Sequence, residues 1–345
     1  MAGISILFRP FAWIYSGVMS VRNWLFDVGI MRERRFAVPV VTIGNLAVGG
    51  TGKTPHTEYL YNLLKTRGKV GILSRGYGRD TKGFRWVHPT STVDECGDEP
   101  CQIKRKYNQA VVAVDENRCE GIQKMLQAEK LAAIVLDDAY QHRYVKPDLN
   151  ILLTDYHRLF SEDHVVPEGH LRESKSGRRR ADFIIVTKCP ADLKPIDFTL
   201  LSKQIQPFAS QHLFFTTRTY SEPYPLFGED RPFAGKKILA VTGISNPETL
   251  VNYLKRYGEV TPLRFSDHHA FGDEDIDRIN KALSGHDAII TTEKDATRLV
   301  SHSEKLSTEV KQAIFVQPVA VSFLRDQADE FRRLTEQSLF AIGKR

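Results

Sequence analysis

The sequence predicts an α/β protein with a mostly parallel sheet, helices on both faces of that sheet, and a second, smaller α/β domain. Three observations lead to this prediction. Short runs of β-branched and apolar residues alternate with helical patterns along most of the chain. A glycine-rich turn follows the first of these runs, at the kind of place where parallel sheets bind ligands. Between about residues 207 and 232 the pattern changes, which indicates a boundary between two domains.

The first part of the chain contains several apolar runs that are short enough to be strands. They cover residues 38–43, 70–73, 111–114, 132–136, 149–153 and 183–186. After the third run, Ile122, Met125 and Leu126 recur at helical spacing. Short β-branched strands separated by helices indicate a parallel sheet that is covered on both faces. The polar motifs of this chain fall after such runs, where the ligands of parallel sheets bind.

The second part of the chain repeats this organisation after a proline-rich connection. Residues 213–220 have the composition of a hairpin strand, and several prolines follow them, so we interpret the connection as a β-hinge. The elements expected after it are strands at 238–241, near Val260 and at 288–291, helices at 247–257 and 276–283, and a closing helix over 321–339.

These patterns divide the chain into five predicted units. They are an N-terminal amphipathic helix (1–35), a nucleotide-binding core domain (36–210), the hinge (211–232), a smaller α/β domain (233–320) and a C-terminal helix (321–345).

Composition places the chain among soluble globular proteins and leaves room for two domains. It has 345 residues, of which 41% are hydrophobic and 26% charged, with a net charge of +6. The basic residues that cluster are Arg32, Arg34, Arg35, Arg172, Lys175, Arg178, Arg179 and Arg180. Such clusters suit anionic partners, and solvated charge is the alternative for the mid-chain group. We expect no nucleic-acid partner. Four cysteines without metal-binding spacing indicate reduced thiols in a cytoplasmic setting.

The N-terminal residues 1–31 are apolar but not a membrane span. Charged residues and a proline interrupt them, and the uncharged stretch over 10–21 is shorter than the roughly 20 residues that cross a bilayer. One helical face carries Phe11, Ile14, Tyr15, Val18, Val21, Leu25 and Val28, while Trp13 and Trp24 lie off that stripe. A basic, aromatic-rich amphipathic helix is typical of an interfacial membrane anchor. A helix packed on its own domain is the alternative.

The turn after the first strand has the residues of a phosphate-binding loop. Gly49, Gly50, Thr51 and Gly52 precede Lys53 and Thr54 at a predicted helix start. Backbone N–H groups of such a turn, together with the helix dipole, bind phosphate oxygens. In this pattern the lysine reaches the β- and γ-phosphates and the threonine hydroxyl binds Mg²⁺. Ala47 replaces the first glycine of the usual motif, and a flexible surface turn is the alternative. We therefore expect a P-loop NTPase-type core that binds a nucleoside triphosphate.

Further carboxylates follow other predicted strands. Asp137 and Asp138 end the run at 132–136, where a carboxylate binds the Mg²⁺ of the nucleotide, directly or through water. A helix or turn cap is the alternative for them. Gln141 and His142 come next and are candidates for orienting phosphate or substrate, unless they are only polar loop residues.

Two more motifs are candidates for proton transfer. In Gly97-Asp98-Glu99-Pro100, Asp98 is placed to accept the proton of an attacking hydroxyl, and Glu99 is a further candidate ligand for Mg²⁺. A simple turn is the alternative there. In Asp267-His268-His269 an imidazole lies beside a carboxylate, which suits acid–base work near neutral pH, although a surface loop explains it equally well.

The segment Thr187-Lys188-Cys189-Pro190 bears on whether the bound nucleotide carries guanine or adenine. This segment has part of the guanine-binding pattern N/T-K-x-D, but Pro190 stands where that pattern requires a carboxylate. A GTPase is therefore disfavoured, and ATP is the expected nucleotide.

Taken in order, these motifs resemble those of the tetraacyldisaccharide 4′-kinase (lipid A 4′-kinase) family. The segments that carry the resemblance are residues 49–55, Ser74-Arg75-Gly76-Tyr77-Gly78-Arg79, Gly97-Asp98-Glu99-Pro100, Leu136-Asp137-Asp138, Gln141-His142, Leu171-Arg172-Glu173, Asp267-His268 and Thr292-Glu293-Lys294-Asp295. The resemblance spans nearly the whole chain.

The resemblance implies transfer of the γ-phosphate of ATP to the 4′-hydroxyl of the tetraacyldisaccharide 1-phosphate precursor of lipid A. It implies that Asp98 and His268 form the dyad that activates this hydroxyl, while Lys53 stabilises the transferring charge. The candidate substrate-binding residues are Arg75, Tyr77, Arg79, Gln141, His142 and Arg172.

The resemblance also implies a peripheral protein at the cytoplasmic face of the inner membrane, because an acylated substrate does not leave the bilayer. We expect a monomer that uses ATP and Mg²⁺ and contacts the membrane surface and the lipid A precursor. Two alternatives remain at this point, a P-loop ATP-dependent ligase or synthase and a nucleotide-switched binding module.

Overall fold

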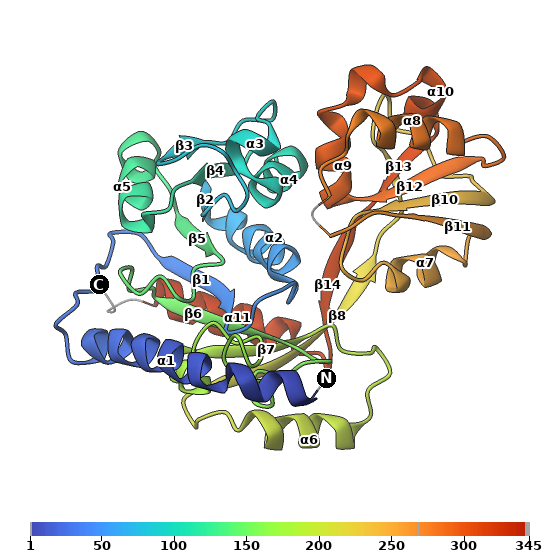
Figure 1. The fold of residues 1–345 in the computed structure, drawn as a ribbon. Helices are drawn as coiled ribbons and strands as arrows, with labels where there is room; N and C mark the ends of the chain where they lie inside the picture. The colour runs from blue at the N-terminus through green and yellow to red at the C-terminus, as the bar shows by residue number, and fades with distance from the viewer. Residues whose placement is uncertain (1, 268, 342–345) are drawn as a thin grey trace.

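The computed structural model describes residues 2–267 and 269–341, which form two lobes, each built on its own sheet (Figure 1). We call the lobe with the nine-stranded sheet the large lobe and the one with the five-stranded sheet the small lobe. Both sheets are mainly parallel and carry helices, so the predicted α/β class with a second, smaller α/β unit is confirmed.

The sheet of the large lobe has the strand order β14-β8-β7-β6-β1-β5-β2-β4-β3. Its strands are β1 (Val40–Asn45), β2 (Val70–Ser74), β3 (Arg85–Trp86), β4 (Val111–Val114), β5 (Ala133–Asp137), β6 (Leu149–Asp155), β7 (Phe183–Thr187), β8 (His212–Tyr220) and β14 (Val319–Phe323). All neighbours are parallel except at the two edges, where β3 and β14 run antiparallel. Because β1 lies in the middle, its carboxyl end opens onto both halves of the sheet.

The central strands are apolar runs because helices bury both of their faces. Every residue of β1, β2, β5 and β7 is buried. The helices of the large lobe are α1 (Ala2–Asp27), α2 (Lys53–Leu64), α3 (Val93–Cys96), α4 (Asp98–Lys106), α5 (Arg118–Ala128), α6 (Pro195–Ile205) and α11 (Ala328–Phe340), with short 3₁₀ turns η1 (Lys65–Arg67) and η2 (Lys175–Arg180). Local sequence sets several starts, since Asn117 caps α5 and Pro195 begins α6.

The small lobe has the strand order β11-β10-β12-β13-β9. Its elements are β9 (Tyr224–Pro225), β10 (Lys237–Thr242), α7 (Glu248–Leu254), β11 (Glu259–Arg264), α8 (Asp273–Ala282), β12 (Ala288–Thr292), α9 (Glu293–Val300), η3 (Ser303–Lys305), α10 (Thr308–Ala313) and β13 (Ile314–Gln317). Only β9 runs antiparallel to its neighbour. The predicted strands of this part are all present.

Two strands of the large sheet lead into and out of the small lobe. β8 carries the chain towards it and β14 brings the chain back, paired antiparallel from Val319 opposite Tyr220 to Phe323 opposite Thr216 (Figure 1). β8 covers much of the segment that was expected to be a hinge, yet it is a full member of the large sheet through its pairing with β7.

The predicted closing helix over 321–339 was wrong at its start. Residues 319–323 form β14, and the helix begins only at Ala328. The β-branched residues Val319 and Val321 favour a strand, and the exposed edge of β8 supplies its hydrogen-bonding partner. No local signal of the sequence reveals that partner.

The core of the large lobe contains a cluster of aromatic rings beneath α11. Phe331 of that helix contacts Phe183, Phe214 and Phe323, with ring centroids between 4.6 and 5.7 Å apart. Phe331 is 1% exposed. All four cysteines are free, as expected from the sequence.

We predict that Phe331→Ala destabilises the large lobe by about 3–5 kcal/mol, because it removes a buried ring and leaves a cavity among the other three. Urea unfolding followed by tryptophan fluorescence measures this change. Arg333→Ala, an exposed position on the same helix, is the control and should change stability by less than about 0.5 kcal/mol. Equal midpoints for the two variants would contradict the packing role of Phe331.

Candidate active site

The glycine-rich turn follows β1 and adopts a shape that its glycines allow. Gly49 and Gly52 have φ values of 102° and 83°, which favour glycine over residues with a side chain. The side-chain amide of Asn45 donates to the Thr51 hydroxyl at 2.9 Å. From β7 and the residue after it, the Thr187 hydroxyl donates to the carbonyl of Thr51 at 2.8 Å, and the Lys188 ammonium donates to the carbonyl of Gly50. The loop is therefore fixed from two sides before any ligand binds.

Helix α2 begins directly after this loop, at Lys53 and Thr54. The first N–H groups of a helix have no partner within it, and the helix dipole is positive there, so this end attracts anions. Lys53 is 9% exposed, and its ammonium lies 3.7 Å from a carboxylate oxygen of Asp138. The structure therefore gives the predicted loop residues the arrangement that binds a polyphosphate.

His56 of α2 contacts the loop and was not identified from the sequence as a residue of the site. Its Nδ1 lies 2.7 Å from the Gly52 carbonyl and donates to it, while Nε2 accepts from the Thr216 hydroxyl at 3.0 Å. Burial lowers the pKa of His56 to about 4, so the ring is neutral at pH 7. Its partner Thr216 lies 160 residues away in β8, and no local pattern of the sequence reveals this contact.

Asp137 and Asp138 lie beside the loop because β5 is the neighbour of β1, with Ile43 opposite Asp137. Asp137 is fully buried; one carboxylate oxygen accepts from Thr57 at 3.0 Å, and the other has no hydrogen-bond partner among the described residues. Burial, Glu99 and Asp138 raise the pKa of Asp137 to about 7. Burial acts in the same direction on Asp138, but Lys53 and Arg172 outweigh it and lower its pKa.

These carboxylates fit a bound Mg²⁺. In the part of the chain that the structure describes, no three His, Cys, Asp or Glu side chains converge closely enough to hold a metal alone. Mg²⁺ with a nucleotide needs less, because it is bound by one or two carboxylates together with phosphates and water. The buried, unpartnered oxygen of Asp137 is what such an ion would satisfy. Thr54 lies at the start of the same helix as Thr57, which contacts Asp137.

Arg172 reaches the site because its segment pairs with the loop. The Arg172 N–H donates to the Leu46 carbonyl at 2.6 Å, and its guanidinium lies 3.1 Å from Asp138. The next residue, Glu173, is 1% exposed and accepts hydrogen bonds from Asn23, Gln141 and Arg180. Glu173 was part of the quoted motif but was not assigned a role. Gln141 also donates to the Asn45 carbonyl, so its side chain braces the loop.

The residues after β2 occupy different positions. Arg75 and Tyr77 are exposed, whereas the Arg79 side chain is tied to Glu116 at 2.6 Å and to the Gly83 carbonyl at 2.8 Å. The Arg79 guanidinium is therefore a brace of its own loop in this structure.

His142 lies in a strongly basic environment. Burial, Arg118, Arg22 and Arg75 together lower the pKa of His142 to about 4. Arg118, at the start of α5, is 3% exposed and was not recognised from the sequence. A buried arginine inside an otherwise ordinary helix has no sequence signature. The positive charges of these three arginines, together with burial, disfavour protonation of His142.

Asp98 is the first residue of α4 and is 9% exposed. It forms a buried ion pair with Arg298 of α9, which belongs to the small lobe. Arg298 was not among the candidate residues identified from the sequence. Glu99, the residue after Asp98, is one of the groups that raise the pKa of Asp137. His268 lies outside the described residues. His269 instead pairs with Asp275 at 2.8 Å.

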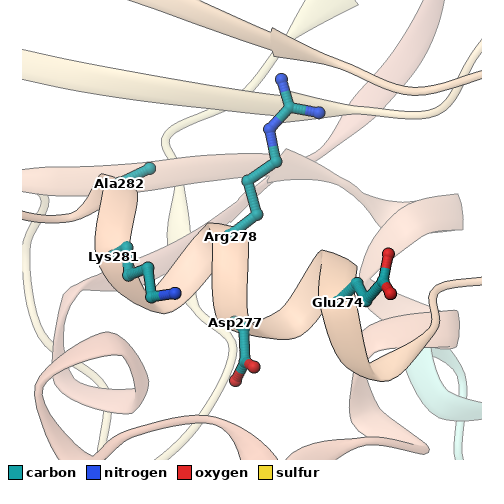
Figure 2. Close-up of a pocket in the computed structure, with 5 residues that line it drawn as sticks. All are labelled: Glu274, Asp277, Arg278, Lys281 and Ala282. Carbon is teal, nitrogen blue, oxygen red and sulfur yellow. The ribbon is translucent and has the colours of Figure 1, made fainter.

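A separate surface hollow lies on the outer side of α8, with a volume of about 500 Å³. Figure 2 shows Glu274, Asp277, Arg278, Lys281 and Ala282, which line it from a single helix. α8 belongs to the small lobe, away from the turn between β1 and α2 (Figure 1). The hollow contains none of the motif residues, so it is not part of the candidate active site.

Helix α1 lies along the large lobe and attaches to it through polar contacts beside the site (Figure 1). The Tyr15 hydroxyl donates to the Arg172 carbonyl at 2.9 Å, Arg22 donates to the Gln141 carbonyl at 3.1 Å, and Asn23 binds Glu173 at 2.8 Å. Within the described residues no helix is long and apolar enough to span a bilayer. Both tryptophans of α1, which the sequence placed off the apolar stripe, lie on its exposed side with much of that stripe. The exposed apolar residues there include Phe11, Trp13, Ile14, Val18, Val21 and Trp24.

The parallel sheet, the glycine loop with Lys53 and the paired carboxylates at the next strand define a P-loop nucleotide-binding protein. A family model described as tetraacyldisaccharide-1-P 4′-kinase matches residues 4–339. The chain therefore belongs to the tetraacyldisaccharide-1-phosphate 4′-kinase family, and the resemblance found in the sequence is confirmed.

Similar proteins agree with this family. The chain is 45% identical to the tetraacyldisaccharide 4′-kinase of Bacteroides thetaiotaomicron, over 94% of this chain and 90% of that protein. It is 46% identical to the enzyme of the same name from Phocaeicola vulgatus, over 93% of this chain and 92% of that protein. A solved structure, LpxK from Aquifex aeolicus in complex with ATP, is 28% identical with a TM-score of 0.77, over 98% of this chain and 100% of that one.

We predict that His142 makes the protein less stable as the pH falls from about 6.5 towards 4. The folded state binds fewer protons than the unfolded state in this window, because the pKa of His142 is lowered from 6.5 to about 4. The resulting loss is at most about 1.4 kcal/mol per pH unit. His142→Gln should reduce the difference in unfolding free energy between pH 7 and pH 5. The exposed variant His164→Gln should leave that difference unchanged, and equal effects of both variants would contradict the prediction.

Proposed function

We propose that this chain transfers the γ-phosphate of ATP to the 4′-hydroxyl of the tetraacyldisaccharide 1-phosphate precursor of lipid A. Membership of the 4′-kinase family and the names of its relatives support the reaction. The observation that carries it is the arrangement of Lys53, Asp138 and Asp137 at the glycine loop. Asp98 begins α4, and its neighbour Glu99 acts on the pKa of Asp137. Family membership favours a kinase over a ligase or a nucleotide-switched module.

ATP is the proposed nucleotide because the similar protein LpxK from Aquifex aeolicus was solved in complex with it. Amides of the loop over 49–54 and the start of α2 bind the phosphates, and Lys53 stabilises negative charge on the transferring group. Lys53 lies 3.7 Å from Asp138, which keeps the ammonium beside the carboxylates that follow β5.

Thr54, Asp137, Asp138 and Glu99 are the residues that would hold Mg²⁺. When bound, the ion neutralises charge on the β- and γ-phosphate oxygens. Asp137 is the best placed of the four, because its free oxygen is buried and lacks a partner among the described residues. Asp138 is already paired with Lys53 and Arg172, so its contact is more easily made through water.

Asp98 is the proposed acceptor of the proton that leaves the 4′-hydroxyl. A carboxylate that orients the attacking hydroxyl is the usual requirement of a kinase site. His268, the other member of the proposed dyad, lies outside the described residues. His269 is committed to Asp275, which favours His268 for that role.

The anionic disaccharide is proposed to bind near His142. Arg22, Arg75 and Arg118 place positive charge around that ring, which suits the 1-phosphate of the acceptor. Tyr77 is 76% exposed two residues after Arg75, and its ring is proposed to lie against a sugar. Arg172 contacts Asp138 and is thus near the transferred phosphate, whereas Gln141 and Arg79 act as braces.

The exposed apolar side of α1 is proposed to lie in the membrane surface. Trp13 and Trp24 are 71% and 55% exposed, and aromatic rings of this kind favour the headgroup region. Because the polar side of α1 contacts Arg172 and Gln141, such binding brings the site close to an acyl-chain substrate. The proposal places a monomer at the cytoplasmic face of the inner membrane. It retains the unit boundaries 1–35, 36–210, 211–232, 233–320 and 321–345.

We predict that the purified chain labels the lipid A precursor from γ-³²P-ATP in detergent micelles only with Mg²⁺ present. Asp98→Asn should lower kcat by at least about 10²-fold and leave the Kd for ATP within about twofold, because Asp98 acts on the acceptor. Lys53→Met should weaken ATP binding as well as turnover. Asp94→Asn, an exposed carboxylate on α3, is the matched control and should remain active.

If the chain binds ATP and Mg²⁺ but does not label the lipid, the proposed reaction is overturned. Full activity of Asp98→Asn would leave the reaction in place and remove the proton-transfer role from Asp98.

We also predict that replacing Phe11, Ile14 and Val18 by serine weakens flotation with vesicles of phosphatidylethanolamine and phosphatidylglycerol. These side chains are 63–66% exposed, so their loss should not unfold the protein. Removing apolar area from a membrane-bound face costs about 25 cal/mol for each Å². Ile196→Ser with Leu200→Ser, exposed apolar positions on α6, is the matched control. An equal loss of flotation in both variants would contradict a specific role of α1 in membrane binding.

A further inference from the structure

The small lobe contacts the large lobe through α9, which packs against α4 (Figure 1). α9 begins in the segment Thr292-Glu293-Lys294-Asp295, a motif to which the sequence assigned no chemistry. α4 begins with Asp98, the proposed proton acceptor. The interface therefore joins α4, which carries the proposed proton acceptor, to α9, whose motif has no assigned role.

Arg298 of α9 binds both carboxylate oxygens of Asp98. Its Nε donates to Oδ1 at 3.0 Å and its Nη2 donates to Oδ2. Arg298 is 6% exposed, so water screens this pair little. A guanidinium that donates two parallel hydrogen bonds fixes the orientation of a carboxylate as well as its position.

Arg298 is itself fixed by the small lobe. Its Nη1 donates to Asp295 at 3.3 Å. The other oxygen of Asp295 accepts from the Gly243 N–H at 2.9 Å and from the Thr292 hydroxyl at 2.7 Å. A chain of hydrogen bonds thus runs from the backbone of the small lobe, through Asp295 and Arg298, to Asp98 in the large lobe.

Two other contacts hold α4 and α9 together without touching Asp98. Arg105 donates to the Thr297 carbonyl at 2.7 Å, and Lys106 pairs with Glu293 at 2.7 Å. The lobes therefore have polar contacts of their own along this interface. The buried pair between Arg298 and Asp98 is a further contact of this interface, and it is the one that binds the Asp98 carboxylate directly.

We infer that Arg298 is a positioning residue which the small lobe supplies to the catalytic carboxylate. A carboxylate has about four lone-pair directions, and Arg298 occupies two of them. The site is complete only while the small lobe is docked, because the orientation of Asp98 depends on it. This inference rests on the proposed role of Asp98 in the kinase reaction.

The test compares Arg298→Ala, Arg298→Lys and Arg105→Ala in the full chain, with the lipid A precursor in micelles. Arg298→Ala should lower kcat on the order of 10²-fold, since misplacing a reacting group costs about that much. The KM for ATP should stay within about twofold. Arg298→Lys should remain impaired, because an ammonium does not bridge both oxygens. Arg105→Ala breaks another contact of the same interface and should retain kcat within about threefold.

Two further measurements separate positioning from a general effect on structure. Added methylguanidinium should restore part of the kcat of Arg298→Ala and none of any loss in Arg105→Ala. In an Asp98→Asn background, Arg298→Ala should cause no further loss, because the group through which it acts is already gone. If Arg298→Ala does not fold, Arg298→Lys carries the same cycle, with melting temperatures as the check on folding.

Several results would overturn the inference. They are equal losses in Arg105→Ala and Arg298→Ala, a full further loss in the Asp98→Asn background, or wild-type kcat in Arg298→Lys. Failure of the proposed function looks different, since Asp98→Asn alone would then keep full activity or the wild-type chain would not phosphorylate the lipid.

Discussion

The pairing of β1 with β5 is the constraint on which the rest of the site depends. It brings the end of the strand that leads to Lys53 beside the strand that ends in Asp137 and Asp138. Lys53 is 9% exposed and Asp137 is fully buried, and buried charges are costly unless they are paired. Lys53 and Arg172 satisfy Asp138, but Asp137 keeps one oxygen without a partner among the described residues. The folded protein thus retains an unsatisfied acceptor where a nucleotide and its metal would bind.

The position of α1 links its exposed apolar side chains to this site. Glu173 is the link, because it accepts hydrogen bonds from Asn23 of α1 and from Gln141, which in turn donates to the loop through Asn45. Ala12 and Phe26 of α1 are buried against the lobe as well, while the apolar residues on the other side of the helix stay exposed. The orientation of α1 relative to the loop is then fixed by contacts within the protein.

Local patterns predicted the parts of this structure that are themselves local. The glycine loop with Lys53, the strand that ends in Asp137 and the apolar strands all arise from neighbouring residues. The contact between Arg298 and Asp98 joins residues 200 positions apart, and His56 meets Thr216 across 160. Such pairs leave no periodicity behind. β14 was mistaken for a helix for the same reason, since its partner β8 lies a whole lobe away in sequence.

The interface between the lobes contains charged side chains, and these affect how readily the lobes separate. Lys106 lies between Glu58 of α2 and Glu293 of α9, at 2.5 and 2.7 Å. Burial, with Glu293 adding to it, raises the pKa of Glu58 to about 7, so the two carboxylates depend on one lysine. Polar interfaces within a chain separate more readily than apolar ones. Glu58 belongs to the helix that starts at Lys53, and Arg298 belongs to the helix that starts at Glu293. Polar contacts around the small lobe therefore reach α2 through Lys106 and Asp98 through Arg298, so a movement of that lobe would change both contacts at once.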